Sequence, residues 1–127
     1  MGATGKHVNQ TTGYLSTHVL DTVRGSPAAG VEVSLYSISG AMRSLLKQVT
    51  TNEDGRTEGP LIPQGELKAG TYELVFDIGA YFVRHGLADG ADFLGSVPVR
   101  FRVNNEGLHY HVPLLAAPYS YSTYRGS

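Results

Sequence analysis

The feature that most constrains the fold of this chain is a set of short segments in which apolar and polar residues alternate. Three segments show it clearly: VEVSLYSI (31–38), TYELVFDI (71–78) and VPVRFRV (97–103). Successive side chains of a strand point to opposite faces, so alternation gives each segment one apolar face and one polar face. Turn-forming stretches separate such segments, among them RGSPAAG (24–30) and NEDG (52–55), whose Asp-Gly pair favours a tight hairpin-type turn. The pattern predicts short strands that each bury one face.

Four more segments have strand-like composition: YLSTHVLDT (14–22), LLKQVTT (45–51), LHYHVPLL (108–115) and YSYSTY (119–124). The segment that starts at Gly79 differs, because its aromatic residues precede the helix-ending Gly86 and suit one or two helical turns. Many short strands and one short helix predict an all-β fold, an antiparallel β-sandwich. The 127 residues fit a single domain, which we expect to span 15–127 after a flexible tail at 1–14.

The composition excludes several classes of protein. The sequence has no cysteine, which excludes disulfides and thiolate metal sites. Ten basic and eleven acidic residues give a net charge of −1, and no basic stripe indicates a nucleic-acid partner. No apolar run approaches the roughly 20 residues of a membrane-spanning helix, and the first residues contain no secretory signal. We therefore expect a cytoplasmic protein that binds neither nucleic acids nor membranes.

Two histidines near the end of the chain are the first candidates for chemistry. His109 and His111 are two residues apart, so a strand would place both on one face, together with Pro113. Proline cannot donate a ladder hydrogen bond, and Pro113 therefore indicates an edge strand or a bulge. In the first half of the chain, His18 lies in a predicted strand and Arg56 follows a predicted turn.

The residues alone leave the role of this set open. A histidine on a strand is most often an ordinary surface residue. We likewise expect no functional role for His7, which lies in the tail, or for His85, which lies in the helical segment. A His-x-His pair with a third histidine is also the ligand set of some zinc hydrolases, which makes a zinc site of His18, His109 and His111 an alternative. The sequence contains no Gly-x-Ser-x-Gly motif for a serine nucleophile and no glycine-rich phosphate loop.

Three stretches carry a family resemblance. In order, they are STHVLDTVRGSPAAGVEV (16–33), TNEDGRTEGPL (51–61) and HYHVPLLAAPYSYSTYRGS (109–127). Together they resemble the transthyretin-like family, and in particular its 5-hydroxyisourate hydrolase branch, over about 15–127. The resemblance implies a β-sandwich of two four-stranded sheets with one short helix. It also implies a homotetramer built as a dimer of dimers.

The resemblance also separates the enzymes of the family from its hormone carriers. The carriers have lysine in place of His18, glutamate in place of Arg56, threonine in place of His111 and alanine in place of Pro113. They also lack the terminal Tyr-Arg-Gly-Ser at 124–127. The chain has the enzyme's residue at each of these positions, which implies that His18, Arg56 and His111 are catalytic.

The family implies a substrate and a place for the tail. The substrate is 5-hydroxyisourate, which histidine-activated water converts to 2-oxo-4-hydroxy-4-carboxy-5-ureidoimidazoline in urate degradation, a part of purine metabolism, with no metal or cofactor. The C-terminus folds into a channel between dimers. The expected substrate-binding residues are therefore His109, Tyr124, Arg125, Gly126 and Ser127, although an orienting or bridging role suits His109 equally well. A transthyretin-type carrier of small molecules remains an alternative.

The chemistry of ring opening suits these side chains. Histidine has a pKa of about 6.5 and can deprotonate water near neutral pH. A guanidinium is planar and always charged, so Arg56 can bind a flat imide-like edge and stabilise an oxygen that gains charge. Either His18 or His111 can serve as the base on these grounds.

Overall fold

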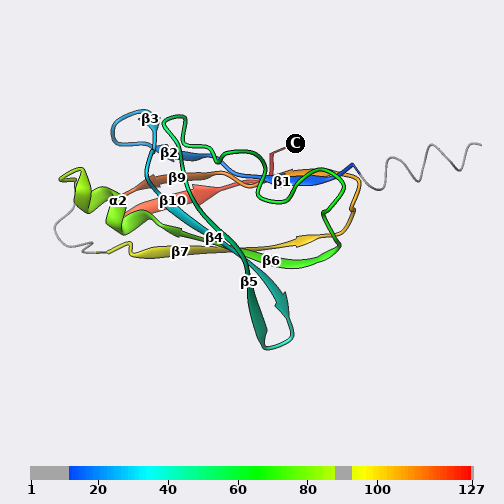
Figure 1. Ribbon diagram of the computed structural model, residues 1–127. Coiled ribbons are helices and arrows are strands. Elements are labelled where there is room, and N and C mark those ends of the chain that lie inside the picture. Colours follow the sequence, from blue (N-terminus) through cyan, green and yellow to red (C-terminus); the bar gives the residue numbers. More distant parts are fainter. Residues whose placement is uncertain (1–11, 88–92, 127) are drawn as a thin grey trace, which may run out of the picture.

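The alternating segments form the strands of two sheets that face each other in the computed structural model, which describes residues 12–87 and 93–126 (Figure 1). The elements are β1 (Tyr14–Ser16), β2 (Val19–Asp21), β3 (Ser26–Pro27), β4 (Glu32–Ser39), β5 (Met42–Thr50), β6 (Gly70–Asp77), α2 (Ile78–Arg84), β7 (Ser96–Val103), β8 (His109–His111), β9 (Leu114–Ala117) and β10 (Ser120–Thr123). One four-stranded sheet has the order β10-β9-β2-β3, the other has the order β5-β4-β6-β7, and β1 and β8 form a separate pair. This arrangement confirms the expected sandwich of two four-stranded sheets with a short helix.

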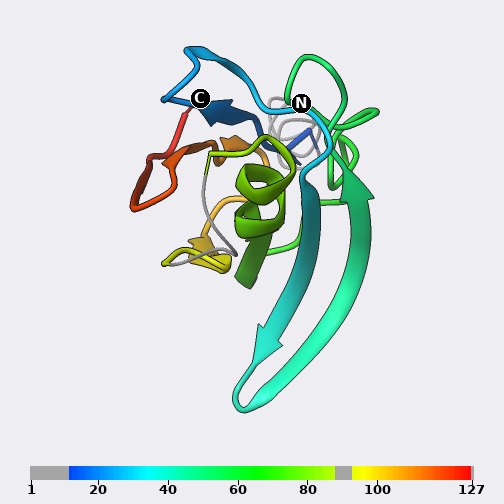
Figure 2. The ribbon, with the colours of Figure 1, turned by 90° about the vertical axis from the view of Figure 1, so that its left-hand side faces the viewer.

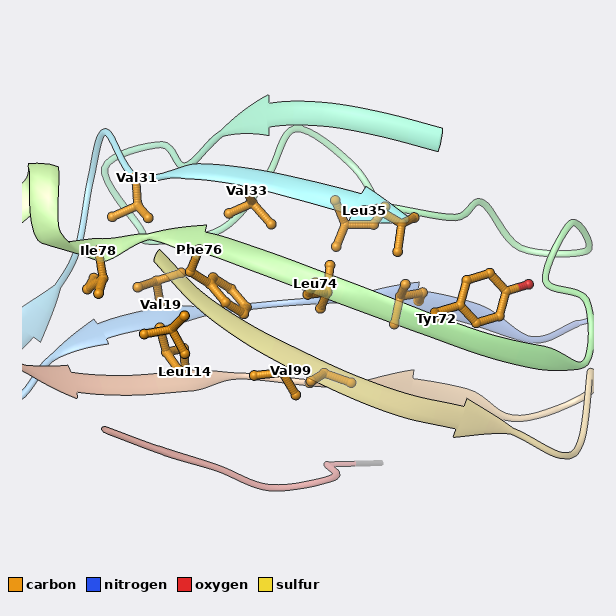
Figure 3. Close-up of a cluster of buried hydrophobic side chains, with 14 of the residues drawn as sticks. Val19, Val31, Val33, Leu35, Tyr72, Leu74, Phe76, Ile78, Val99 and Leu114 are labelled. Atoms are coloured by element: carbon orange, nitrogen blue, oxygen red, sulfur yellow. The ribbon is translucent and has the colours of Figure 1, made fainter. Parts of the chain in front are cut away.

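The apolar faces of the two sheets meet in one core. Figure 3 shows side chains of β4, β6 and β7 directed toward those of the opposite sheet. The buried residues drawn there include Val19, Val33, Leu35, Leu74, Phe76, Val99 and Leu114. Full burial of each such side chain contributes about 1.5–3 kcal/mol to folding. The predicted inward positions of the three alternating segments are therefore confirmed, apart from Phe101, which is only partly buried against the core.

The strands near the two ends of the described chain pair in parallel, which corrects the expectation of a purely antiparallel sandwich. β1 pairs with β8, and β2 pairs with β9, both in parallel. The second sheet is antiparallel throughout. Alternation shows only which face of a strand is buried, and it carries no information on the direction of a distant partner.

Two predicted strands are each divided into two shorter ones. The segment 14–22 divides into β1 and β2, and the segment 108–115 divides into β8 and β9. Pro113 lies at the second division, where it has no N–H to donate, and the Thr17 hydroxyl donates to the Val112 carbonyl at 2.7 Å. Pro113 thus lies outside both strands, between β8, which belongs to the two-stranded pair, and β9, which lies between β10 and β2.

The folded part begins before Leu15. Tyr14 is the first residue of β1, and the Gly13 N–H donates to the Glu106 carbonyl at 3.0 Å. Residues 1–11 of the expected tail, including His7, lie outside the described residues.

The Asp-Gly turn is tight, but it does not join two paired strands. β5 pairs with β4 in a hairpin that extends beyond the body of the sandwich (Figure 2). No strand lies between β5 and β6 among the fully described residues 51–69. The turn instead packs on β2: Gly55 has a φ of +73°, and its carbonyl accepts the Val19 N–H at 2.8 Å. A Cβ at Gly55 would lie 2.3 Å from the Val19 carbonyl oxygen, so only glycine permits this approach.

The helix α2 lies at one end of the sandwich (Figure 1) and confirms the helical prediction. It buries Tyr81, whose hydroxyl donates to the buried Asp21 carboxylate at 2.7 Å. Burial and this hydrogen bond raise the pKa of Tyr81 to about 12. Past its end, His85 accepts a hydrogen bond from Arg24 at 2.6 Å, away from the other described histidines. No helix in the described residues is long and apolar enough to span a membrane.

Candidate active site

The register of the parallel pair β1–β8 gathers polar side chains on the outer face of the sandwich. Leu15 lies opposite Tyr110, and both are buried. Ser16 lies opposite His111, one position further along. Because neighbouring residues of a strand point to opposite faces, Ser16, His109 and His111 all point away from the core. The predicted common face of the two histidines is confirmed.

The Ser16 hydroxyl lies between the two histidines. Its Oγ is 2.7 Å from Nε2 of His109 and 2.8 Å from Nδ1 of His111. The Tyr14 ring stacks on the His109 ring with centroids 3.8 Å apart and planes 11° apart. Ser16 and Tyr14 were not expected in the site. Their even spacing before His18 was an available signal, because it places all three on one face of a strand.

His18 precedes β2 and Arg56 follows the Asp54-Gly55 turn, and both join the same cluster. The half-buried His18 ring has its Nε2 2.9 Å from the Asp54 carbonyl oxygen, so the Gly55 turn fixes the imidazole. Arg56 and Ser16 line one pocket of about 210 Å³, together with Thr17, Thr57, Gly59 and Pro60. After burial, the positive charge of Arg56 also lowers the pKa of both His18 and His111.

The surroundings of the three histidines favour the neutral form of each imidazole. Burial is the main cause that lowers the pKa of His111, followed by the charges of His109, Arg56 and His18. Burial and then Arg56 lower the pKa of His18, against the opposing effect of its hydrogen bond to Asp54. Burial and then Arg125 lower the pKa of His109. A neutral imidazole can accept a proton, as a general base must.

The C-terminal tail meets the cluster through its backbone. The Gly126 N–H donates to the His111 carbonyl at 2.7 Å, and the Gly126 carbonyl accepts the His111 N–H at 3.3 Å. The bridge between His111 and Gly126 thus places this end of the chain beside β8. A Cβ at Gly126 would lie 3.0 Å from Cδ2 of His111, tighter than an ordinary contact. The absence of a side chain thus lets the tail lie against the histidine.

The side chains of Tyr124 and Arg125 line a pocket with Tyr110 and Val112. The Arg125 guanidinium donates to the His109 carbonyl at 3.2 Å and lies 4.4 Å from the centre of the Tyr110 ring, on the opposite face of β8. Tyr124 is 57% exposed. Ser127 lies outside the described residues. Within one chain the structure therefore brings together five of the predicted residues: His18, Arg56, His109, His111 and Gly126.

The zinc alternative finds little support in this geometry. In residues 12–87 and 93–126, no three His, Cys, Asp or Glu side chains are grouped so that they could hold a metal ion. Nε2 of His18 is hydrogen-bonded to a backbone carbonyl, and His109 and His111 each direct one ring nitrogen at Ser16. The arrangement suits proton transfer and the binding of a planar, oxygen-rich molecule better than metal binding.

The fold and the site define a class of protein, and comparison with known proteins identifies it. Residues 15–126 match the HIUase/Transthyretin family. The chain therefore belongs to this family. It is 53% identical to 5-hydroxyisourate hydrolase of Deinococcus radiodurans over 113 residues, which cover 89% of this chain and 95% of that protein.

Two solved structures with the same fold have different functions. Klebsiella pneumoniae 5-hydroxyisourate hydrolase is 38% identical with a TM-score of 0.74, and the match covers 90% of this chain and 99% of that one. Sea bream transthyretin in complex with thyroxine is 29% identical with a TM-score of 0.79, and the match covers 88% of this chain and 93% of that one. The same sandwich thus occurs in a hydrolase and in a hormone-binding protein.

Gly126→Ala should detach the tail from β8. The added methyl group meets the His111 ring at 3.0 Å, so either the tail or the ring must move. Hydrogen exchange at the backbone amide of residue 126 should become at least about tenfold faster, while the free energy of unfolding falls by only about 1 kcal/mol. The matched control is Gly95→Ala, where a Cβ meets nothing within 4 Å. Equal exchange in both variants would show that the close approach is unimportant.

The histidine cluster should make the protein less stable in mild acid. In the folded protein the pKa values of His18, His109 and His111 lie below the ordinary value of 6.5. At a pH between the folded-state pKa and 6.5, the unfolded chain therefore binds more protons than the folded protein. The free energy of unfolding should therefore fall as the pH drops below about 6.5 and level off only below the folded-state pKa values. Urea denaturation at a series of pH values measures this, and His111→Ala should show a shallower fall. An unchanged slope in that variant would contradict the role assigned to His111.

Proposed function

We propose that this protein hydrolyses 5-hydroxyisourate in the urate-degradation branch of purine metabolism, in the cytoplasm. The observation that carries the proposal is an outer cluster on a transthyretin-type sandwich: Ser16 contacts His111 and shares a pocket with Arg56, and His18 is bonded to the turn that precedes Arg56. The relative from Deinococcus radiodurans, with 53% identity, and the solved structure from Klebsiella pneumoniae are both 5-hydroxyisourate hydrolases, which supports the same activity here.

His18, Arg56 and His111 have different roles in ring opening. His18 and His111 bind a water molecule, and one of them removes its proton as the oxygen adds to a carbonyl carbon of the six-membered ring. Arg56 orients the flat substrate and stabilises the oxygen that becomes negative. The tetrahedral intermediate then breaks its C–N bond, the ring nitrogen takes up a proton, and 2-oxo-4-hydroxy-4-carboxy-5-ureidoimidazoline is released.

The expected substrate-binding residues have supporting roles, and those of the C-terminal tail act in an assembly of several subunits. His109 is engaged by Tyr14 and Ser16, which supports an orienting role more than direct contact with substrate. We propose a homotetramer, a dimer of dimers, in which Tyr124, Arg125, Gly126 and Ser127 close a channel between dimers. The edge strand β10 supports such an assembly, since all four of its residues are exposed and an uncovered edge readily pairs with another chain.

A carrier function is the second candidate, because the thyroxine-bound sea bream transthyretin has the same sandwich. Carriage requires a ligand that binds without turnover. The cluster of neutral histidines beside a guanidinium favours the hydrolase, because a binding site does not need a proton acceptor. Release of product from 5-hydroxyisourate distinguishes the two functions.

His18→Ala, Arg56→Ala and His111→Ala should each lower turnover by about 10²-fold or more, because each removes a base or a charge-stabilising donor. The measurement follows the absorbance decay of 5-hydroxyisourate made in situ by urate oxidase. His85→Ala is the matched control, since His85 bonds Arg24 near the end of α2 and should keep normal turnover. Thermal unfolding and sedimentation establish that each variant is folded and assembled. Normal turnover by an assembled His111→Ala protein would exclude that residue from the mechanism.

Metal removal should leave turnover unchanged. The proposed mechanism transfers protons between water, imidazole and substrate and involves no metal ion. Dialysis against a strong chelator, with metal analysis of the dialysed protein, tests this directly. Loss of turnover that zinc restores would instead support the zinc hydrolase built on His18, His109 and His111.

A further inference from the structure

We infer that Ser16 is a positioning residue that fixes the tautomer of His111 and so makes its Nε2 the proton acceptor of the site. The inference rests on the proposed hydrolase function for its kinetic consequence, but the tautomer can be observed without substrate. It concerns a residue on β1 outside the set His18, Arg56 and His111 to which catalysis is assigned above.

The hydrogen-bonding capacity of a hydroxyl carries the argument. Serine has one proton to donate and two lone pairs that accept. Ser16 Oγ lies 2.7 Å from Nε2 of His109 and 2.8 Å from Nδ1 of His111, and no third partner lies among the described residues. The hydroxyl therefore donates its proton to one histidine and accepts an N–H from the other. The tautomers of the two rings are thereby coupled: of Nε2 of His109 and Nδ1 of His111, one is protonated and the other is not.

Only one of the two resulting arrangements gives a base. If His111 carries its proton on Nδ1 and donates it to Ser16, its Nε2 has a lone pair. That nitrogen has no hydrogen-bond partner in the described part of the chain and is available to a water molecule. Ser16 then donates to Nε2 of His109, whose own proton lies on Nδ1. In the reverse arrangement Nε2 of His111 is protonated and cannot accept a proton.

The surroundings hold the three side chains in place. The Tyr14 ring stacks on His109 at 3.8 Å, which fixes the His109 ring against Ser16. The register of β1 and β8 sets Ser16 opposite His111, and the Gly126 backbone closes against the same histidine. His111 is thus held from one side by the hydroxyl and from the other by the tail.

The test combines spectroscopy with kinetics on Ser16→Ala and Ser16→Thr. In the unliganded wild-type protein, nitrogen-15 shifts of the imidazoles at alkaline pH should show His111 protonated on Nδ1. Ser16→Ala should give a mixture of tautomers and a kcat about 10²-fold lower, with KM changed by less than about threefold. Ser16→Thr retains the hydroxyl and should restore both the tautomer and most of the rate. Ser39→Ala, an exposed serine at the end of β4, is the matched control and should behave as wild type.

The outcomes separate this inference from the proposed function. Nδ1 protonation in the wild type that is lost in Ser16→Ala supports the inference even if 5-hydroxyisourate is not hydrolysed. A wild-type His111 protonated on Nε2 overturns it, whatever the activity and even if Ser16→Ala fails to fold. A folded Ser16→Ala protein with wild-type tautomer and kcat also overturns it.

Discussion

The parallel pairing of β1 with β8 and of β2 with β9 is the interaction on which the functional site depends. The first pairing sets Ser16 opposite His111, and the second sets Val19 opposite Leu114, so the two ladders supply the outer polar cluster and part of the inner core. A slip of one residue would turn the histidines inward and expose the core residues. Burial of Leu15 and Tyr110 therefore fixes the register of β1 and β8, the pair that carries His109 and His111.

Much of the fold could be predicted because its signals are local. The alternation of Tyr72, Leu74 and Phe76 predicts both β6 and its buried face, and all three residues are buried. The helix before Gly86 is likewise signalled by neighbouring residues. The direction of pairing between β1 and β8 could not be predicted, since it depends on the path of the whole intervening chain.

The candidate site was predictable in its members but not in its connections. Spacing places His109 and His111 on one face, and the family resemblance adds His18 and Arg56. The bridging role of Ser16 could not be predicted, because its even spacing with Tyr14 and His18 indicates a shared face but does not identify the residue on the opposite strand. The contact of Gly126 is made by the backbone, which residue type alone does not reveal. The family therefore indicates which residues matter, and the structure indicates what each one touches.

The position of the cluster on the outer face explains how one fold serves different proteins. The sea bream transthyretin retains the sandwich at 29% identity, with a TM-score of 0.79. Side chains such as Arg56 and His111 point away from the core, so their replacement leaves the packing between sheets intact. Chemistry can change on this face while the hydrophobic core stays the same.

The distance along the chain between β1 and β8 has a consequence for the order of folding. The contact between Ser16 and His111 joins residues 95 positions apart, whereas β4 and β5 are joined by a tight hairpin. Closing so large a loop costs more entropy than closing a hairpin, so the antiparallel sheet should form before the ladder that carries the histidines. During synthesis on the ribosome, β1 emerges first and remains unpaired with β8 until β8 has been synthesised. The functional face is therefore among the last parts of the molecule to become native, and its formation reports that the whole sandwich has closed.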